Sequence, residues 1–226
     1  MKIGILGTGM VGRSHAGKLA GLGHEVMVGT KNTGAKMAEN KADAMGNPPF
    51  SSWLKENPGV KLGIFKECAG HGGMVYNALK GEAALETLKP LESALNGKIL
   101  IDITNALDFS KGMPPTLFVC NTDSLGEQIQ RALPGVKVVK TFNTMNALLQ
   151  VNPGLLAGGD HHTFVGGNDE GARAEVAAIL RDWYGWKNII DLGDITSARG
   201  TEMLMLFWIR MWGTLKNPMF NYKIVQ

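Results

Sequence analysis

Three glycines within the first twelve residues have the spacing of a phosphate-binding turn. Gly7, Gly9 and Gly12 follow the short apolar run Lys2–Leu6 and precede a segment with helical periodicity. In a strand–turn–helix unit the first glycine allows the tight turn, the second lets a pyrophosphate approach the backbone, and the third lets helix and strand pack closely. The N–H groups at the helix N-terminus then attract the phosphates. This turn predicts a dinucleotide-binding site.

The residues after the second predicted strand, His24–Gly29, indicate which dinucleotide binds. An NAD site normally carries an acidic residue there, which bonds to the ribose hydroxyls. This chain has Thr30, Lys31 and Asn32 instead. One cation and two hydrogen-bond donors suit a 2′-phosphate, and a charge-assisted hydrogen bond contributes about 1.5–3 kcal/mol. We therefore predict NADP as the cofactor, preferred roughly tenfold to a hundredfold over NAD.

Asn and Thr side chains recur where the later predicted strands end. Ligands of doubly wound sheets bind outside the carboxyl ends of the strands, so we expect these residues near cofactor or substrate. No pair of carboxylates suited to acid–base catalysis accompanies them. Lys140 and Tyr76 stay open as proton donors. We therefore assign no catalytic residue. The predicted strands are Val60–Phe65, Met74–Leu79, Lys98–Ile103 and Val138–Phe142, and the polar residues at their ends are Asn77, Thr104, Asn105, Asn143, Thr144 and Asn146.

Strands that alternate with helical stretches, such as Glu82–Leu95, predict an α/β fold. We expect a Rossmann-type doubly wound, mainly parallel sheet with added C-terminal strands at Thr163–Gly166 and Asn188–Leu192. We interpret residues 1–226 as a single Rossmann-like domain. Its NADP-binding half is 1–106, and 107–226 form the substrate side and the C-terminal extension.

The last predicted helix, Ala198–Trp212, is apolar almost all round, and Thr196 or Ser197 is expected to cap it. A helix that is hydrophobic on every face is buried. Three uses stay open for it: ordinary core packing, contact with another subunit, and lining of a ring-binding pocket.

Composition excludes several classes of protein. The net charge of +3 gives no basic footprint for nucleic acid. Cys68 and Cys120 lie far apart in the sequence, which favours reduced thiols and a cytoplasmic protein. The longest apolar run, Met203–Ile209, is far shorter than the roughly 20 residues that span a bilayer. We expect a protein that binds neither membrane nor nucleic acid.

Histidines do not form a recognisable metal site. His161 and His162 are adjacent, and neighbouring residues on a strand point to opposite faces, so we predict no bound metal. Arg13 and His15 fall in the first turns of the helix after the glycine turn. We expect Arg13 in solvent and His15 at the protein surface, and contact of His15 with a phosphate stays open as an alternative.

Four segments of the chain resemble NADP oxidoreductases of the coenzyme F420-dependent type. The resemblance implies hydride transfer between NADP(H) and a deazaflavin or flavin-like acceptor such as coenzyme F420, and a homodimer. The segments are GTGMVGRSHAGKLAGLGHEVMVGTKN at 7–32, GKILIDITNALDF at 97–109, VKVVKTFNTMNA at 136–147 and DLGDITSARGTEMLMLFWIRM at 191–211.

The resemblance also implies roles for individual residues. It implies that the pyrophosphate is contacted by Thr8, Gly9, Met10 and Val11. It implies that the 2′-phosphate is bound by Thr30, Lys31 and Asn32. Nicotinamide contacts fall to Asn77, Ala78 and Leu79, and contacts with the second substrate to Asn143, Thr144 and Met145.

Hydride transfer between two rings requires that the protein orient the rings and exclude water, and it needs no acid–base groups. The Asn and Thr side chains at the strand ends are consistent with this chemistry. Two alternatives stay open. One is an NADPH-dependent reductase of a small carbonyl, imine or ferric substrate. The other is an NADP-binding sensor without turnover.

Overall fold

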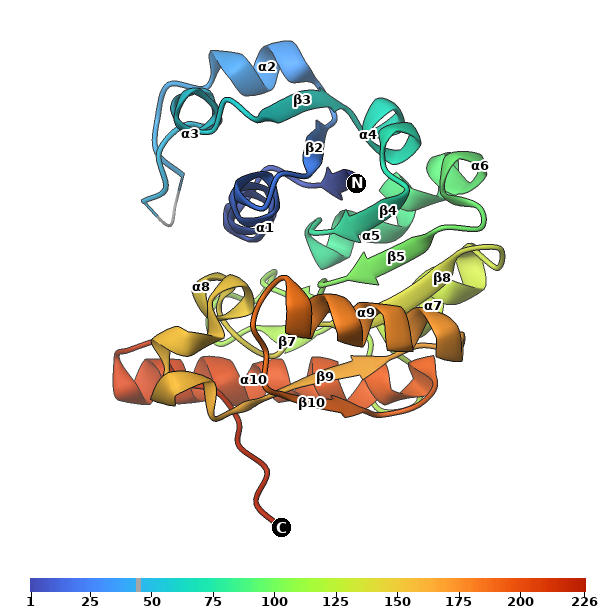
Figure 1. Ribbon diagram of the computed structural model, residues 1–226. Coiled ribbons are helices and arrows are strands. Elements are labelled where there is room, and N and C mark those ends of the chain that lie inside the picture. Colours follow the sequence, from blue (N-terminus) through green and yellow to red (C-terminus); the bar gives the residue numbers. More distant parts are fainter. Residues whose placement is uncertain (44–45) are drawn as a thin grey trace.

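A single eight-stranded sheet runs through the chain, which a computed structural model describes at residues 1–43 and 46–226 (Figure 1). The strand order is β10-β9-β8-β5-β4-β1-β2-β3. From β3 to β8 this is the 3-2-1-4-5-6 order of dinucleotide-binding sheets. The strands are β1 (Lys2–Leu6), β2 (Glu25–Thr30), β3 (Val60–Ile64), β4 (Met74–Asn77), β5 (Ile99–Asp102), β8 (Lys137–Thr141), β9 (His162–Gly166) and β10 (Asn188–Asp191).

Neighbouring strands of this sheet are parallel, except that β9 runs antiparallel to β8. Lys140 lies opposite Gly166 and Thr141 opposite Val165 in that pairing. The predicted mainly parallel, doubly wound sheet with added C-terminal strands is confirmed. A short antiparallel hairpin, β6 (Leu107–Asp108) with β7 (Thr116–Leu117), was not predicted.

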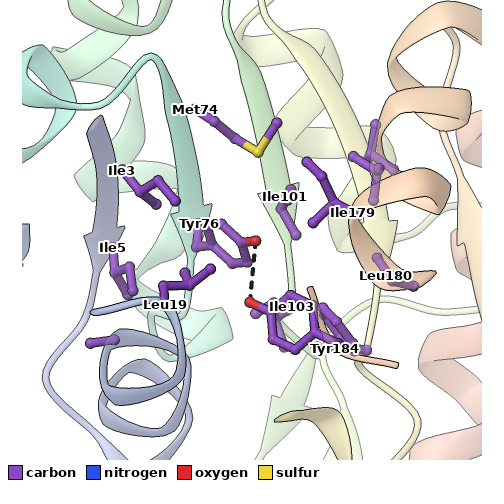
Figure 2. Packing of buried hydrophobic residues seen from close by; sticks show 14 of the residues in the cluster. Ile3, Ile5, Leu19, Met74, Tyr76, Ile101, Ile103, Ile179, Leu180 and Tyr184 are labelled. Atoms are coloured by element: carbon purple, nitrogen blue, oxygen red, sulfur yellow. Dashed lines mark hydrogen bonds between the residues drawn. The ribbon is translucent and has the colours of Figure 1, made fainter. Parts of the chain in front are cut away.

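Helices cover both faces of the sheet (Figure 1). Successive side chains of a strand point to opposite faces, and because both sets are apolar here, each face needs a covering layer. Tyr76 and Ile101 join the core on one face, whereas Val75 and Leu100 join the core on the other. Figure 2 shows the first core, where Ile3, Ile5 and Leu19 pack beside Tyr76. The first face carries α1 (Met10–Gly21), α3 (Phe50–Glu56), α8 (Ala147–Val151) and α9 (Glu170–Asp182), and the second carries α4 (Phe65–His71), α5 (Gly81–Leu88), α6 (Glu92–Leu95) and α7 (Leu125–Ala132).

Two local predictions were wrong. The expected helix Glu82–Leu95 is interrupted by a 3₁₀ turn at Lys89–Leu91, since Pro90 lacks the N–H that a continuous helix needs. The last helix, α10 (Ala198–Leu215), lacks the expected side-chain cap. Ser197 occupies its N-cap position but donates its hydroxyl to the Asp194 carbonyl and makes no capping hydrogen bond. Asp194 accepts from the Thr196 backbone N–H and caps the preceding 3₁₀ turn, Ile195–Ser197.

Only one side of α10 is buried within this chain. Met205, Trp208 and Ile209 pack inward. Met203, Leu206 and Phe207 are 45%, 37% and 54% exposed and lie on one stripe, at i, i+3 and i+4. We expected α10 to be buried on every face, but contacts within this chain bury only one of its faces. No helix among residues 1–43 and 46–226 is long and apolar enough to cross a membrane.

Candidate functional site

The three glycines of the N-terminal turn differ in what surrounds them. A Cβ on Gly12 would lie 2.1 Å from the Gly7 carbonyl oxygen, and one on Gly7 would lie 2.4 Å from the Ala78 oxygen. A Cβ on Gly9 would meet nothing within 4 Å. Gly7 and Gly12 are thus required for close backbone packing, whereas Gly9 faces open space. Helix α1 begins directly after Gly9, and no side chain among the described residues caps it. The N–H groups of its first turn are therefore available to a pyrophosphate.

The Arg13 side chain is hydrogen-bonded to the backbone of this turn, and the expectation that it is solvated was wrong. Its side chain is 8% exposed. Nε donates to the Thr8 carbonyl at 2.8 Å, and one terminal nitrogen donates to the Pro48 carbonyl at 2.5 Å. The guanidinium lies over the Phe50 ring. These contacts fix the backbone of Thr8, one of the predicted pyrophosphate contacts.

The predicted 2′-phosphate residues follow β2 directly. Thr30 is buried and Lys31 is exposed, while the Asn32 side-chain oxygen accepts from the Ala35 N–H and caps the short helix α2 (Thr33–Ala38). Lys31 lines a hollow of about 460 Å³ together with Lys66. Lys66 is a second cation that sequence reasoning missed, because it follows a different strand, β3.

A cleft of about 460 Å³ opens beside the nucleotide turn. Four predicted site residues meet in its wall: Val11, Leu79, Thr104 and Asn105. They come from α1, the end of β4 and the end of β5, which agrees with the expectation that the carboxyl ends of these strands form one site. Lys80, Gly81, Glu82, Ile103, Leu107 and Phe109 complete the lining.

Asn77 and Thr104 are held in place by a buried carboxylate. Asp102 is 0% exposed, and its Oδ1 accepts from Asn77 Nδ2 at 2.9 Å and from the Thr104 hydroxyl at 2.8 Å. Asn77 is itself fully buried. Its side chain therefore shapes the strand end, and Ala78 contacts the turn through its carbonyl beside Gly7.

Lys140 and Glu202 complete this buried charge network. Lys140 Nζ lies 2.8 Å from Asp102 Oδ2, 2.8 Å from Glu202 Oε1 and 2.6 Å from the Thr104 carbonyl. Burial lowers the pKa of Lys140, but the attraction of Asp102 and Glu202 outweighs it and holds the pKa above its ordinary value. Glu202 also accepts from the backbone N–H groups of Leu125 and Gly126, at the start of α7.

The residues predicted to contact the second substrate lie behind the cleft wall. Asn143, Thr144 and Met145 are each at most 4% exposed. Asn143 reaches the wall through Asn105: its Nδ2 donates to Asn105 Oδ1 at 3.0 Å, and Asn105 Nδ2 donates back to the Asn143 carbonyl at 2.9 Å. Asn146 caps α8 and donates to the Pro218 carbonyl.

His15 is fully buried, so its expected surface position was wrong. Its ring contacts the rings of Tyr76, Phe142 and Tyr184. The hydroxyls of the two tyrosines are 3.2 Å apart and hydrogen-bonded (Figure 2). Burial lowers the pKa of His15 to about 4, against an opposing effect of its hydrogen bond to Gln150. His15 is therefore neutral near pH 7.

The adjacent histidines have separate structural partners. His161 is buried, with Nε2 3.0 Å from the Pro153 carbonyl oxygen and Nδ1 2.8 Å from Asn221 Nδ2. His162 Nδ1 accepts from the Ile224 N–H. Within residues 1–43 and 46–226, no group of three or more His, Cys, Asp or Glu side chains could hold a metal ion.

Comparison with known proteins gives matches along the whole chain. The family model described as NADP oxidoreductase, coenzyme F420-dependent, matches residues 2–106. An F420-dependent NADP reductase of Methanocaldococcus jannaschii is 32% identical over 212 residues, which cover 90% of this chain and 89% of that protein. A crystal structure from Arthrobacter sp. FB24, provisionally assigned as an F420-dependent NADP reductase, is 55% identical, with a TM-score of 0.95 and full coverage of both chains.

A second group of relatives is larger than this chain. The rat metalloreductase STEAP3 is 27% identical over 213 residues, which cover 93% of this chain but only 38% of that protein. The similarity therefore concerns one part of that protein.

Proposed function

Because this chain belongs to the family of coenzyme F420-dependent NADP oxidoreductases, we propose that it transfers a hydride between NADP(H) and the deazaflavin ring of coenzyme F420. The observation that carries the proposal is the cleft that joins Val11 of the nucleotide turn to Thr104 and Asn105 at the end of β5. In this assignment residues 1–106 hold the nucleotide, and 107–226 provide the acceptor side and the C-terminal extension.

The nucleotide turn fits the cofactor by its own geometry. The open space at Gly9 and the uncapped start of α1 form a cradle that a pyrophosphate would fill. Thr8, Met10 and Val11 would line it, and Thr30, Lys31 and Asn32 would hold the 2′-phosphate. The bound cofactor supplies the hydride. The chain's own residues orient the two rings and exclude water.

Neither of the two side chains that stayed open as proton donors is exposed to the cleft. All three Nζ hydrogens of Lys140 have acceptors, so none faces the cleft. Tyr76 is fully buried, and burial raises the pKa of its hydroxyl. A carbonyl or imine reductase that protonates its substrate through either residue is not supported. Transfer between two rings makes no such demand on the protein.

Turnover with defined acceptors tests the proposal. Purified protein is mixed with NADPH and, in separate reactions, with F420, FMN, a cyclic imine or ferric citrate, and the absorbance of NADPH and of each acceptor is followed. We expect oxidation of NADPH with F420 and little with the others. Turnover with the imine or the ferric salt alone, or tight NADPH binding without any turnover, would contradict the proposal.

Replacing Lys31 by aspartate should reverse the cofactor preference. The substitution removes the charge-assisted hydrogen bond behind the predicted tenfold to hundredfold preference and adds repulsion, so the affinity for NADPH should fall below that for NADH, which is retained. Titration of each nucleotide by fluorescence measures both. Lys61→Asp, an equal charge change at an exposed position of β3, is the matched control. An unchanged ratio of the two affinities in Lys31→Asp would show that the assignment is wrong.

The exposed stripe of α10 supports a homodimer. The stripe consists of Met203, Leu206 and Phe207, and Phe207 is the most exposed of the three. Phe207→Glu should weaken dimerisation by roughly thirtyfold or more, since loss of an aromatic anchor costs about 2 kcal/mol. Leu22→Glu makes the same kind of change at another exposed apolar residue and should leave the dimer intact. Sedimentation velocity distinguishes these outcomes, and a monomeric parent protein would refute the dimer.

We also infer a cytoplasmic location, supported by two cysteines that are both free, Cys68 buried and Cys120 exposed. Fractionation of the source cells with an antibody against the chain would test it.

A further inference from the structure

A buried polar cluster joins the nucleotide-binding helix α1 to the back of the cleft wall, and the proposed reaction has no step that uses it. His15 on α1 has a partner at each ring nitrogen. Nε2 lies 3.0 Å from Gln150 Oε1, and Nδ1 lies 2.9 Å from the Tyr184 hydroxyl oxygen. His15 and Gln150 are 0% and 2% exposed. Burying polar groups is costly unless each is hydrogen-bonded, and here they are.

The Gln150 amide has a fixed orientation. Its Nε2 donates to the carbonyl oxygens of Phe142 at 3.0 Å and Met145 at 3.3 Å. Both amide hydrogens are thus used, and Oε1 remains as the acceptor toward His15. The Nε2 of His15 therefore carries the proton, which agrees with a neutral ring. One side chain holds both ends of the 142–145 turn, and His15 holds that side chain.

The turn needs such support because its backbone is strained. Phe142 has φ of 61°, in the left-handed region. A bulky residue held there costs about 1–3 kcal/mol and persists only where the surroundings over-determine it. The hydrogen bond from Gln150 to the Phe142 carbonyl is one such restraint, and ring contact with His15 is another.

The turn reaches the cleft through a reciprocal pair of amides. Asn143 and Asn105 exchange two hydrogen bonds, of 3.0 and 2.9 Å, and Asn105 lines the cleft. A displacement of the turn would therefore displace the cleft wall. The path runs from His15 through Gln150 and the turn to Asn105, so one buried network connects the helix of the nucleotide turn to the wall of the cleft.

We propose that His15 and Gln150 are positioning residues for hydride transfer: they hold the 142–145 turn, and through it Asn105, which lines the cleft where the two rings would meet. The proposal rests on the function proposed above. Two rings exchange hydride only at close range, and a misplacement of about 1 Å can cost a hundredfold in rate. Loosening the turn should thus lower kcat and leave NADPH affinity unchanged, since the contacts of the glycine turn stay in place.

Two substitutions at His15 separate positioning from packing. The amide nitrogen of His15→Gln can reach Gln150 Oε1 much as Nε2 does. The shorter His15→Asn reaches only the Nδ1 position beside Tyr184 and leaves Gln150 Oε1 without its donor. We expect His15→Asn to lower kcat about tenfold to a hundredfold, with the Kd for NADPH unchanged, and His15→Gln to recover most of the lost rate.

Tyr184→Phe is the structural control. It removes the other partner of the His15 ring without touching Gln150, so it should lower Tm and leave kcat near that of the parent. If Tyr184→Phe loses as much kcat as His15→Asn, the effect is one of general packing and the proposal is overturned. Equal kcat in His15→Asn, His15→Gln and the parent protein also overturns it.

Amide hydrogen exchange of the 142–146 segment gives a readout that requires no acceptor. A positioning role predicts faster exchange in His15→Asn than in His15→Gln or the parent protein. Equal exchange in all three contradicts it. If the parent protein does not turn over F420, the proposed function fails, but the exchange comparison still decides whether His15 and Gln150 hold the turn.

Discussion

Replacing Gly9 by alanine is expected to raise the Kd for NADPH roughly a hundredfold while the protein keeps its fold. A Cβ at this position meets no protein atom within 4 Å, and Gly9 has φ of −75°, which any residue adopts. The added methyl group would therefore stand in the space that the pyrophosphate approaches. Displacing the phosphates from one or two N–H groups removes charge-assisted hydrogen bonds of about 1.5–3 kcal/mol each.

Gly12→Ala provides the contrast. Its Cβ would lie 2.1 Å from the Gly7 carbonyl oxygen, so the turn and the start of α1 must move. We expect this variant to lose thermal stability as well as nucleotide affinity. Calorimetry and NADPH titration on both variants give the comparison. Unchanged NADPH affinity in Gly9→Ala would place the nucleotide elsewhere, and an equal loss of Tm in both would refute the distinction between the two glycines.

The backbone of the proposed nucleotide end could be predicted because its determinants are local. Lys2 to Asn32 form one strand–turn–helix–strand unit, and the type and spacing of its residues predict the chemistry proposed for it. Even here tertiary contacts overrode local expectation. Arg13 was expected in solvent, but it is buried against Phe50 and donates to the Pro48 carbonyl 35 positions away.

The proposed acceptor end depends on contacts between residues far apart in the chain. His15 meets Gln150 135 positions away and Tyr184 169 positions away, and Glu202 accepts from the Leu125 N–H across 77 positions. No local pattern encodes such pairs. One signal was present for Glu202, which is the only acidic residue in the mostly apolar helix α10. A lone buried acid requires a partner, and the sequence did not show that the partner is Lys140.

Replacing Lys140 by methionine is expected to destabilise the protein by about 3–5 kcal/mol. Lys140 is 2% exposed and lies between two buried carboxylates, Asp102 and Glu202, each 2.8 Å from Nζ. Its removal would leave both carboxylates buried without a counter-charge. The Thr104 carbonyl would also lose its donor. Chemical denaturation measures the change in free energy of unfolding.

Lys137→Met is the matched control, because it makes the same change three residues earlier on β8. Its ion pair with Asp169 is exposed, with an N–O distance of 3.2 Å. An exposed pair contributes about 0–1 kcal/mol, so Lys137→Met should be nearly neutral. Equal losses in the two variants would mean that the buried network contributes no more than a surface ion pair.

A double variant identifies the origin of the loss. If the cost of Lys140→Met comes from an uncompensated charge, then adding Glu202→Gln should recover part of it, although Glu202→Gln alone weakens two hydrogen bonds to the start of α7. Additive losses would instead indicate that the two side chains act independently. Recovery would show that β5, β8, α7 and α10 are connected through this charge, which makes the last helix part of the support for the cleft residue Thr104.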